Sequence, residues 1–158
     1  MVDDQSRDSR TLLDARLDAP GLAALGDRLA RRLRAGDTVL LQGGLGAGKT
    51  HFARALIQAM TGPGTEVPSP TYTLVQTYPL ADTTLWHFDL YRLEDPRELA
   101  ELGLEPAFGE IALIEWPERL GTDRPARRLE LHLSPEGEAA RRVRLIAHGD
   151  WGDRLDDL

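Results

Sequence analysis

The sequence contains no cysteine, only one lysine and no long apolar run. The absence of cysteine excludes disulfides, thiolate metal sites and cysteine nucleophiles, and it agrees with a reducing compartment. No segment approaches the roughly 18 consecutive apolar residues that a membrane-spanning helix requires. Residues 1–10 are polar and charged, so they do not form the apolar segment of a signal peptide. We therefore expect a cytoplasmic protein that has no membrane partner.

An excess of acidic over basic residues gives the chain a net charge of -7. Contacts to nucleic acid phosphates are made by basic residues, so this balance argues against strong unspecific binding to DNA or RNA. The arginines do gather in two clusters, at residues 31–34 and 141–144. Such clusters are more typical of solvated faces than of RNA contacts, and we expect no DNA partner.

The length of 158 residues fits one domain of ordinary size, covering residues 1–158. Apolar residues that recur every three or four positions predict helices, and short apolar runs between turn residues predict strands. Residues 1–10 show no period, so we expect them to be disordered. The expected helices cover residues 20–34, 50–60 and 96–102. The expected strands cover residues 11–17, 37–42, 71–78, 84–91 and 111–115, followed by a hairpin of residues 129–133 and 143–147.

A glycine-rich segment lies between the strand expected at residues 37–42 and the helix expected at 50–60. It reads G-G-L-G-A-G-K-T and matches the pattern G-x-x-x-x-G-K-[ST] in full. Glycines in such a loop let successive backbone N–H groups surround a phosphate, and the following helix adds a positive field. We therefore predict a site for a nucleoside triphosphate with Mg²⁺. Its expected cofactor-binding residues in this segment are Gly43, Gly44, Leu45, Gly46, Ala47, Gly48, Lys49, Thr50 and His51.

The lysine content points to the same loop. Of 19 basic residues 18 are arginine, and the only lysine is Lys49. A compact, flexible ammonium reaches phosphate oxygens in a way that the broad guanidinium of arginine does not. We therefore expect Lys49 to bind the terminal phosphates, and the hydroxyl of Thr50 to bind Mg²⁺.

Two acidic residues at the ends of apolar strands are candidates for Mg²⁺ binding and for hydrolysis. Glu115 follows the run Ile-Ala-Leu-Ile, and Asp89 follows Leu-Trp-His-Phe. Ligands of open α/β sheets lie outside the carboxyl ends of parallel strands, and Mg²⁺ requires hard oxygen ligands. We expect catalytic roles for Glu115, Asp89 and Lys49, and metal binding by Thr50, Glu115 and Asp89. Which acid binds the metal and which positions water stays open, as does the alternative that each acid only ends its strand.

Three further residues have more than one interpretation. Thr71 follows a stiff Ser-Pro pair and could present its hydroxyl to the metal or the terminal phosphate, but threonine is also an ordinary strand residue. Trp116 directly follows Glu115, and it either shields the site, docks a partner or belongs to the core. His87 alternates onto the strand face of Asp89, where a buried, hydrogen-bonded histidine is the more ordinary arrangement than a functional one.

Four segments follow one another along the chain: L-Q-G-G-L-G-A-G-K-T, S-P-T-Y-T-L, H-F-D-L-Y-R-L and I-E-W-P-E. Together they resemble the TsaE (YjeE) family over residues 22–120. The first segment is shared by many families, and the other three make the resemblance specific. Gly44 stands where the family commonly has Asp, and His51 stands where it often has Thr. Neither difference removes a phosphate-binding group.

The resemblance implies an ATPase subunit, slow alone and stimulated by partners. It also implies that this subunit works with the TsaD and TsaB proteins in making threonylcarbamoyladenosine, a tRNA modification, so the chain would be linked to tRNA indirectly. The choice of ATP over GTP as cofactor rests on the resemblance. It also implies that Thr71 lies in a switch-like segment and Trp116 beside the site. The order of elements, read by itself, predicts a three-layer P-loop α/β domain with a mainly parallel central sheet flanked by helices and a C-terminal antiparallel hairpin.

Two other functions stay open. In a small nucleoside or metabolite kinase, Asp89 would accept a proton from the substrate hydroxyl and Arg92 would hold the substrate, but no arginine-bearing lid segment is evident. In a nucleotide-gated binding module there would be little turnover, and Glu115 argues against it. An ordinary guanine-nucleotide switch is disfavoured because its N-K-x-D motif needs a second lysine.

Overall fold

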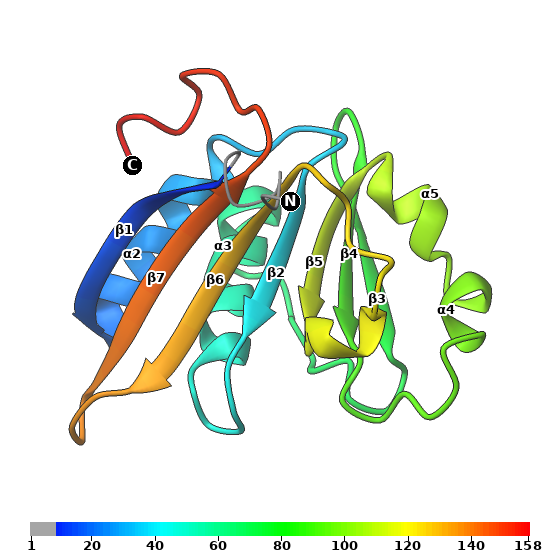
Figure 1. The fold of residues 1–158 in the computed structure, drawn as a ribbon, viewed down its shortest axis with the longest axis horizontal. Helices are drawn as coiled ribbons and strands as arrows, with labels where there is room; N and C mark the ends of the chain where they lie inside the picture. The colour runs from blue at the N-terminus through cyan, green and yellow to red at the C-terminus, as the bar shows by residue number, and fades with distance from the viewer. Residues whose placement is uncertain (1–8) are drawn as a thin grey trace, which may run out of the picture.

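Strand β2 lies at the centre of a seven-stranded sheet whose order is β1-β7-β6-β2-β5-β4-β3 (Figure 1). The computed structural model describes residues 9–158. The strands are β1 Ser9–Asp18, β2 Thr38–Gln42, β3 Val75–Pro79, β4 Thr84–Asp89, β5 Ile111–Glu115, β6 Arg128–Pro135 and β7 Ala140–His148. The helices are α2 Ala19–Ala30, α3 Lys49–Thr61, α4 Glu98–Glu101 and α5 Leu104–Phe108, and a 3₁₀ helix η1 covers Pro117–Leu120.

The four central strands β6, β2, β5 and β4 are parallel to one another. Strands β6 and β7 form the expected C-terminal hairpin, and β1 and β3 add antiparallel edges on the two sides. The expected three-layer α/β fold and its hairpin are confirmed, although the antiparallel edges make the whole sheet mixed. Parallel strands are covered on both faces, which explains why β2 and β5 consist of buried apolar residues with few exceptions.

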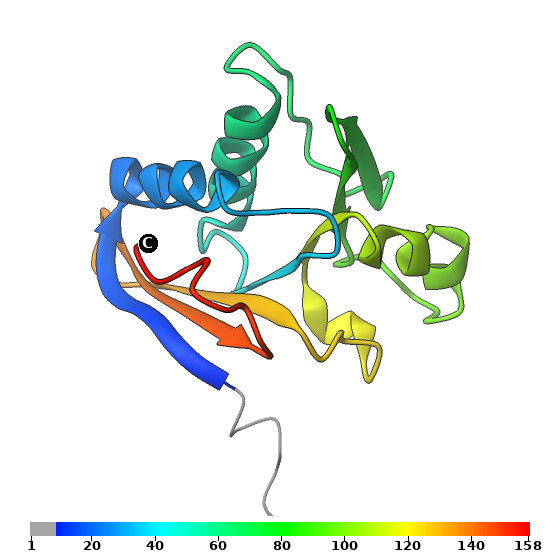
Figure 2. The ribbon, with the colours of Figure 1, turned by 90° about the horizontal axis from the view of Figure 1, so that it is seen from above.

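Alternate residues of β2 belong to two separate cores. Val39 and Leu41 pack under α2 and α3, together with apolar residues of β6 and β7. Leu40 faces the opposite side and packs with residues of α4, α5 and η1. Figure 2 shows the long helices α2 and α3 on one side of the sheet and the short helices on the other. The sheet is therefore the middle of three layers. The carboxyl ends of its parallel strands β4 and β5 lie beside the glycine loop.

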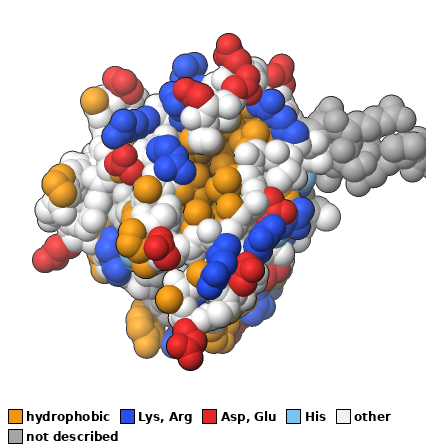
Figure 3. Space-filling model, turned by 90° about the vertical axis from the view of Figure 1, so that its left-hand side faces the viewer, with side chains coloured by type: hydrophobic (Ala, Val, Ile, Leu, Met, Phe, Trp, Pro, Cys, Tyr) orange, Lys and Arg blue, Asp and Glu red, His pale blue; other side chains and the backbone are white. Residues whose placement is uncertain are grey.

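Strand β1 forms one edge of the sheet, and its outer edge is protected by charge. Leu12, Leu13 and Leu17 are partly buried against the core, whereas Asp14 and Arg16 are exposed. Figure 3 shows this side of the molecule, where apolar side chains lie in the centre and charged side chains surround them. Charged side chains and a register shift between Thr11 and Leu13 are features that discourage pairing with another strand.

The structure differs from the sequence expectation at several element ends: the helix expected at residues 20–34 ends at Ala30, the strand expected at 84–91 ends at Asp89, and two strands begin at other residues than expected. Residues 71–74 form a turn instead of the start of a strand, because the N–H of Leu74 donates to the carbonyl of Pro70 at 2.7 Å and Leu74 has a φ angle of 68°. Ser9 and Arg10, expected to be disordered, begin β1 because they pair with the end of β7. The rest of that expectation concerns residues 1–8, which lie outside the described residues. Within residues 9–158, no helix has the length and apolar character needed to cross a membrane.

Candidate functional site

The loop between β2 and α3 has backbone conformations and contacts that need glycine. A β-carbon at Gly43 would lie 2.5 Å from the carbonyl oxygen of Leu133 on β6, so only glycine fits there. Gly46 and Gly48 have φ angles of 74° and 106°, in the left-handed region that other residues rarely adopt. The loop leads into the N-terminus of α3 at Lys49. Its N–H groups and the positive end of the helix form an arrangement suited to an anion.

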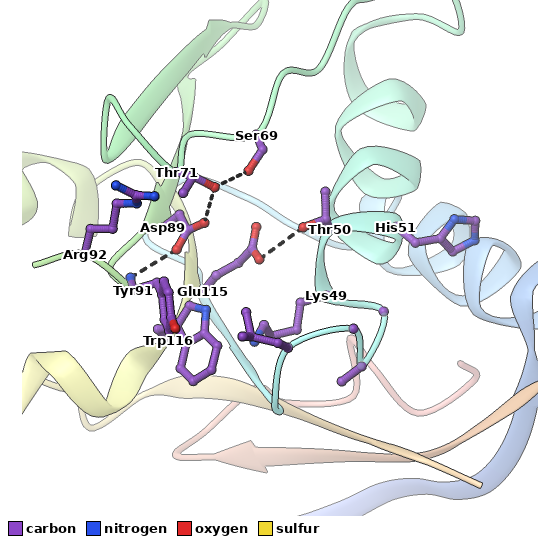
Figure 4. A pocket seen from close by; sticks show the side chains of 14 residues that line it. Lys49, Thr50, His51, Ser69, Thr71, Asp89, Tyr91, Arg92, Glu115 and Trp116 are labelled. Carbon is purple, nitrogen blue, oxygen red and sulfur yellow. Dashed lines mark hydrogen bonds between the residues drawn. The ribbon is translucent and has the colours of Figure 1, made fainter. Parts of the chain in front are cut away.

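A cavity of about 370 Å³ lies between this loop and the carboxyl ends of β4 and β5 (Figure 4). Gly43 and Gly44, expected to bind the cofactor, do not line it, and their carbonyls accept hydrogen bonds from Lys49. Ser69 and Tyr91 line it although neither was an expected site residue, and Arg92, which was considered only for the alternative kinase, lines it as well. The expected residues that line it are Leu45, Gly46, Ala47, Gly48, Lys49, Thr50, His51, Thr71, Asp89, Glu115 and Trp116.

Asp89 and Glu115 are neighbours at the ends of two parallel strands, as their register pairing shows. Both are buried, with exposed fractions of 5% and 2%. The hydroxyl of Thr50 donates to Glu115 Oε1 at 3.5 Å, and the hydroxyl of Thr71 donates to Asp89 Oδ2 at 3.2 Å. In Figure 4 the two carboxylates point into the space between these threonines. The second Asp89 oxygen accepts the backbone N–H of Tyr91 at 3.1 Å.

His87 holds the far oxygen of Glu115. Its Nε2 lies 2.7 Å from Glu115 Oε2, and the ring is fully buried. This confirms the expectation of a buried, hydrogen-bonded histidine. The other ring nitrogen, Nδ1, has no hydrogen-bond partner among residues 9–158. The contact fixes the Glu115 side chain, because one of its oxygens is held from within the sheet while the other faces the cavity.

Lys49 is buried between the loop and Trp116. Its ammonium donates to the carbonyls of Gly43 and Gly44, the latter at 3.3 Å, and it lies 3.6 Å from the centre of the Trp116 ring. Burial lowers the pKa of Lys49, and the negative charge of Glu115 opposes this shift. Trp116 has a left-handed φ angle of 59°, which directs the chain from β5 into η1. The indole therefore borders the site, although its other side packs on the core.

The contacts of two side chains near the loop were not evident from the sequence. The side chain of His51 points away from the cavity toward α2, where its Nε2 lies 3.1 Å from the carbonyl oxygen of Ala19 (Figure 4). Arg141 on β7 donates hydrogen bonds to the carbonyls of Gly46 and Ala47 in the loop. No sequence pattern links residues about 94 positions apart, so only the fold reveals this contact.

The donor set at the cavity suits a magnesium ion only when a ligand completes it. Among residues 9–158 there is no group of three His, Asp or Glu side chains that could hold a metal by itself. The oxygens at the cavity include the two carboxylates and the hydroxyls of Thr50 and Thr71. Mg²⁺ in phosphate-binding sites commonly has one or two carboxylate ligands and shares phosphate oxygens. The residues present therefore fit Mg²⁺ bound together with a phosphate chain.

The strand-loop-helix unit and the parallel centre of the sheet define the chain as a protein of the P-loop α/β fold. A family model described as Threonylcarbamoyl adenosine biosynthesis protein TsaE matches residues 18–143. The chain thus belongs to the TsaE family.

Relatives and a solved structure agree with this assignment. The chain is 40% identical to the tRNA threonylcarbamoyladenosine biosynthesis protein TsaE of Rickettsia felis over 131 residues, which cover 82% of this chain and 77% of that protein. It is 34% identical to the protein of that name from Bacillus subtilis, with 76% of this chain and 75% of that protein covered. The crystal structure of Bacillus subtilis YdiB matches with a TM-score of 0.75 and 25% identity, covering 93% of this chain and 92% of that chain.

Proposed function

We propose that this chain binds and hydrolyses ATP with Mg²⁺, and that it works with the TsaD and TsaB proteins in tRNA threonylcarbamoyladenosine biosynthesis. The pathway is supported by the family and by the names of the relatives. The ATPase activity is supported above all by one observation: the glycine loop and two buried carboxylates border the same cavity. Buried carboxylates repel a bound phosphate unless a cation lies between them, so this arrangement favours a metal-bound nucleotide.

The hydrogen bonds of the two acids favour different roles. Glu115 contacts Thr50, the residue whose hydroxyl is the expected metal ligand of the loop, so we assign Glu115 to the metal side of the site. Asp89 contacts Thr71, which lies outside the loop on the segment before β3, so we assign this pair to the terminal phosphate and the attacking water. Mg²⁺, when bound, draws negative charge from the phosphate oxygens.

Lys49 is the residue whose role can be tested most directly by binding. A charge-assisted contact between an ammonium and phosphate contributes on the order of 1.5 to 3 kcal/mol, or roughly ten- to a hundredfold in affinity. We expect Lys49→Ala to lose that much affinity for ATP in calorimetry with Mg²⁺ present, and Lys49→Arg to recover only part of it. Arg54 is an exposed cation on the same helix, so Arg54→Ala is the matched control and keeps wild-type affinity.

Other results would point to a different function. ATP affinity that is equal in wild type, Lys49→Ala and Lys49→Arg would remove the phosphate-binding role of the loop. Transfer of phosphate from ATP to an added nucleoside would favour the small kinase. Tight binding with no phosphate release in the presence of TsaD and TsaB would favour the nucleotide-gated binding module.

A further inference from the structure

Arg141 connects the C-terminal hairpin to the glycine loop. Its Nε donates to the carbonyl of Ala47 at 3.0 Å, and its Nη2 donates to the carbonyl of Gly46 at 3.1 Å. The third nitrogen, Nη1, donates to the carbonyl of Ala140 at 3.0 Å, which fixes the guanidinium on its own strand. The backbone of Arg141 is held in the sheet between β1 and β6. The loop is therefore attached to the sheet through two consecutive peptide groups.

These two hydrogen bonds set the direction of the loop N–H groups. A peptide group is planar and trans, so its carbonyl and its N–H point in opposite directions. When Arg141 holds the carbonyl of Ala47, the N–H of Gly48 must point away from Arg141. That N–H has no hydrogen-bond partner among residues 9–158. The preceding N–H, that of Ala47, closes the loop on the carbonyl of Gly44 at 3.2 Å.

The charge of Arg141 is not neutralised by another side chain. No carboxylate of residues 9–158 forms an ion pair with it, whereas its neighbour Arg142 pairs with Asp14 at 2.8 Å on the opposite face of the sheet. An arginine that is half-buried and has only carbonyl partners contributes a net positive charge beside the loop. A cation there favours a bound anion, because the surroundings screen its charge less than bulk water does.

We propose that Arg141 is a positioning residue of the nucleotide site, which orients the Gly46–Ala47–Gly48 peptide groups so that the free N–H of Gly48 is available to phosphate. This inference rests on the proposed function of the loop, and it adds the C-terminal hairpin to the site. Arg141 acts through the loop backbone and lies outside the lining of the main cavity.

A second hollow offers a different role for the same side chain. This space of about 330 Å³ adjoins the main cavity through Gly48 and His51, and it is lined by Leu22, Glu138 and Arg141 among others. Arg141 could there contact the nucleoside part of the ligand instead of organising the loop. The two roles differ in one respect: only the positioning role affects a ligand that consists of phosphates alone.

The test compares binding of ATP and of inorganic tripolyphosphate, each with Mg²⁺, to wild type and three variants by calorimetry. We expect Arg141→Ala to lose about tenfold in affinity for both ligands, as removal of a pair of charge-assisted hydrogen bonds would cause. Arg141→Lys should recover part of the loss, because it keeps the positive charge but has one nitrogen in place of the two that contact the loop. The matched control Arg142→Ala removes an adjacent arginine on the opposite face and should stay within about twofold of wild type. Thermal denaturation of each variant checks that the fold is retained.

Three results would overturn the proposal. Wild-type affinity of Arg141→Ala for both ligands would mean that the contact has no effect on binding. A loss for ATP with unchanged tripolyphosphate binding would assign Arg141 to the nucleoside. An equal loss in Arg142→Ala would show a general effect of charge. If the wild type itself binds neither ligand, the proposed function fails together with this proposal. The other three results differ from this one, because in them the wild type binds and only the variants decide.

Discussion

Replacement of Glu115 by glutamine changes the charge of the site with little change in shape. Glu115 accepts hydrogen bonds at both oxygens, from His87 inside the sheet and from Thr50 at the cavity. Its exposed fraction is 2%, so bulk water screens its negative charge only weakly, and loss of that charge is felt in full at the site. Loss of a charged group from the reacting centre reduces rates by roughly 10² to 10³, or about 2.7 to 4 kcal/mol in activation free energy. We expect hydrolysis by Glu115→Gln to fall by that factor while ATP affinity stays within about tenfold of wild type.

The assay is single-turnover release of phosphate from ATP at saturating Mg²⁺, together with ATP binding by calorimetry. Glu118→Gln is the matched control, because Glu118 is exposed, lies three residues further along and also acts electrostatically on Lys49. Its release rate should stay close to wild type. Unchanged hydrolysis in Glu115→Gln would refute the reasoning and leave Glu115 as a residue that only ends β5. A fall of equal size in Glu118→Gln would trace the effect to net charge near Lys49.

Three further outcomes follow from other contacts. We expect the wild-type chain to bind TsaD and TsaB more tightly with a nonhydrolysable ATP analogue than with ADP, by about 1 to 3 kcal/mol, and Thr71→Ala to reduce this difference. Equal partner affinity of the wild type in the two nucleotide states would contradict this prediction. Burial raises the pKa of Glu130, but hydrogen bonds from His132 and Arg128 outweigh this and bring the pKa to about 2. Because the folded-state pKa is depressed, Glu130→Gln should lower the free energy of unfolding at pH 7, and urea titrations should show this difference vanish as the pH falls from about 4.5 toward 2. Gly43→Ala should lower the melting temperature, since its β-carbon would lie 2.5 Å from a carbonyl oxygen of β6, and an unchanged melting temperature would mean that the strand can move.

The sequence predicted those parts of the fold that depend on local pattern. The apolar run at β5 gave bounds of Ile111–Glu115, which the structure confirms, and the glycine motif located the start of α3 within one residue. The prediction of a strand in the segment before β3 was wrong. Threonine and tyrosine favour strands, but the turn there depends on the carbonyl of Pro70 and on the left-handed backbone of Leu74. Short helices such as α5, with five residues, are too brief for a periodic signal.

Those site residues could be predicted whose role follows from their type and from their position at the end of a strand. Asp89 and Glu115 were expected near the glycine loop because both end apolar strands, and the structure brings them together there. The contact of His87 with Glu115 joins two strands, and that of Arg141 with the loop joins segments distant in the chain. Neither contact has a local pattern, so the order and register of the strands were needed to find them.

The central claim is that this chain releases phosphate from ATP and that its partners increase the rate. The most direct measurement is phosphate release from ATP with Mg²⁺ by the wild-type chain, alone and with TsaD and TsaB, beside the Lys49→Ala variant under both conditions. Our account predicts slow release alone, faster release with the partners, and almost none from Lys49→Ala in either case. Absence of release from the wild type under both conditions, or equal release by Lys49→Ala, would contradict it.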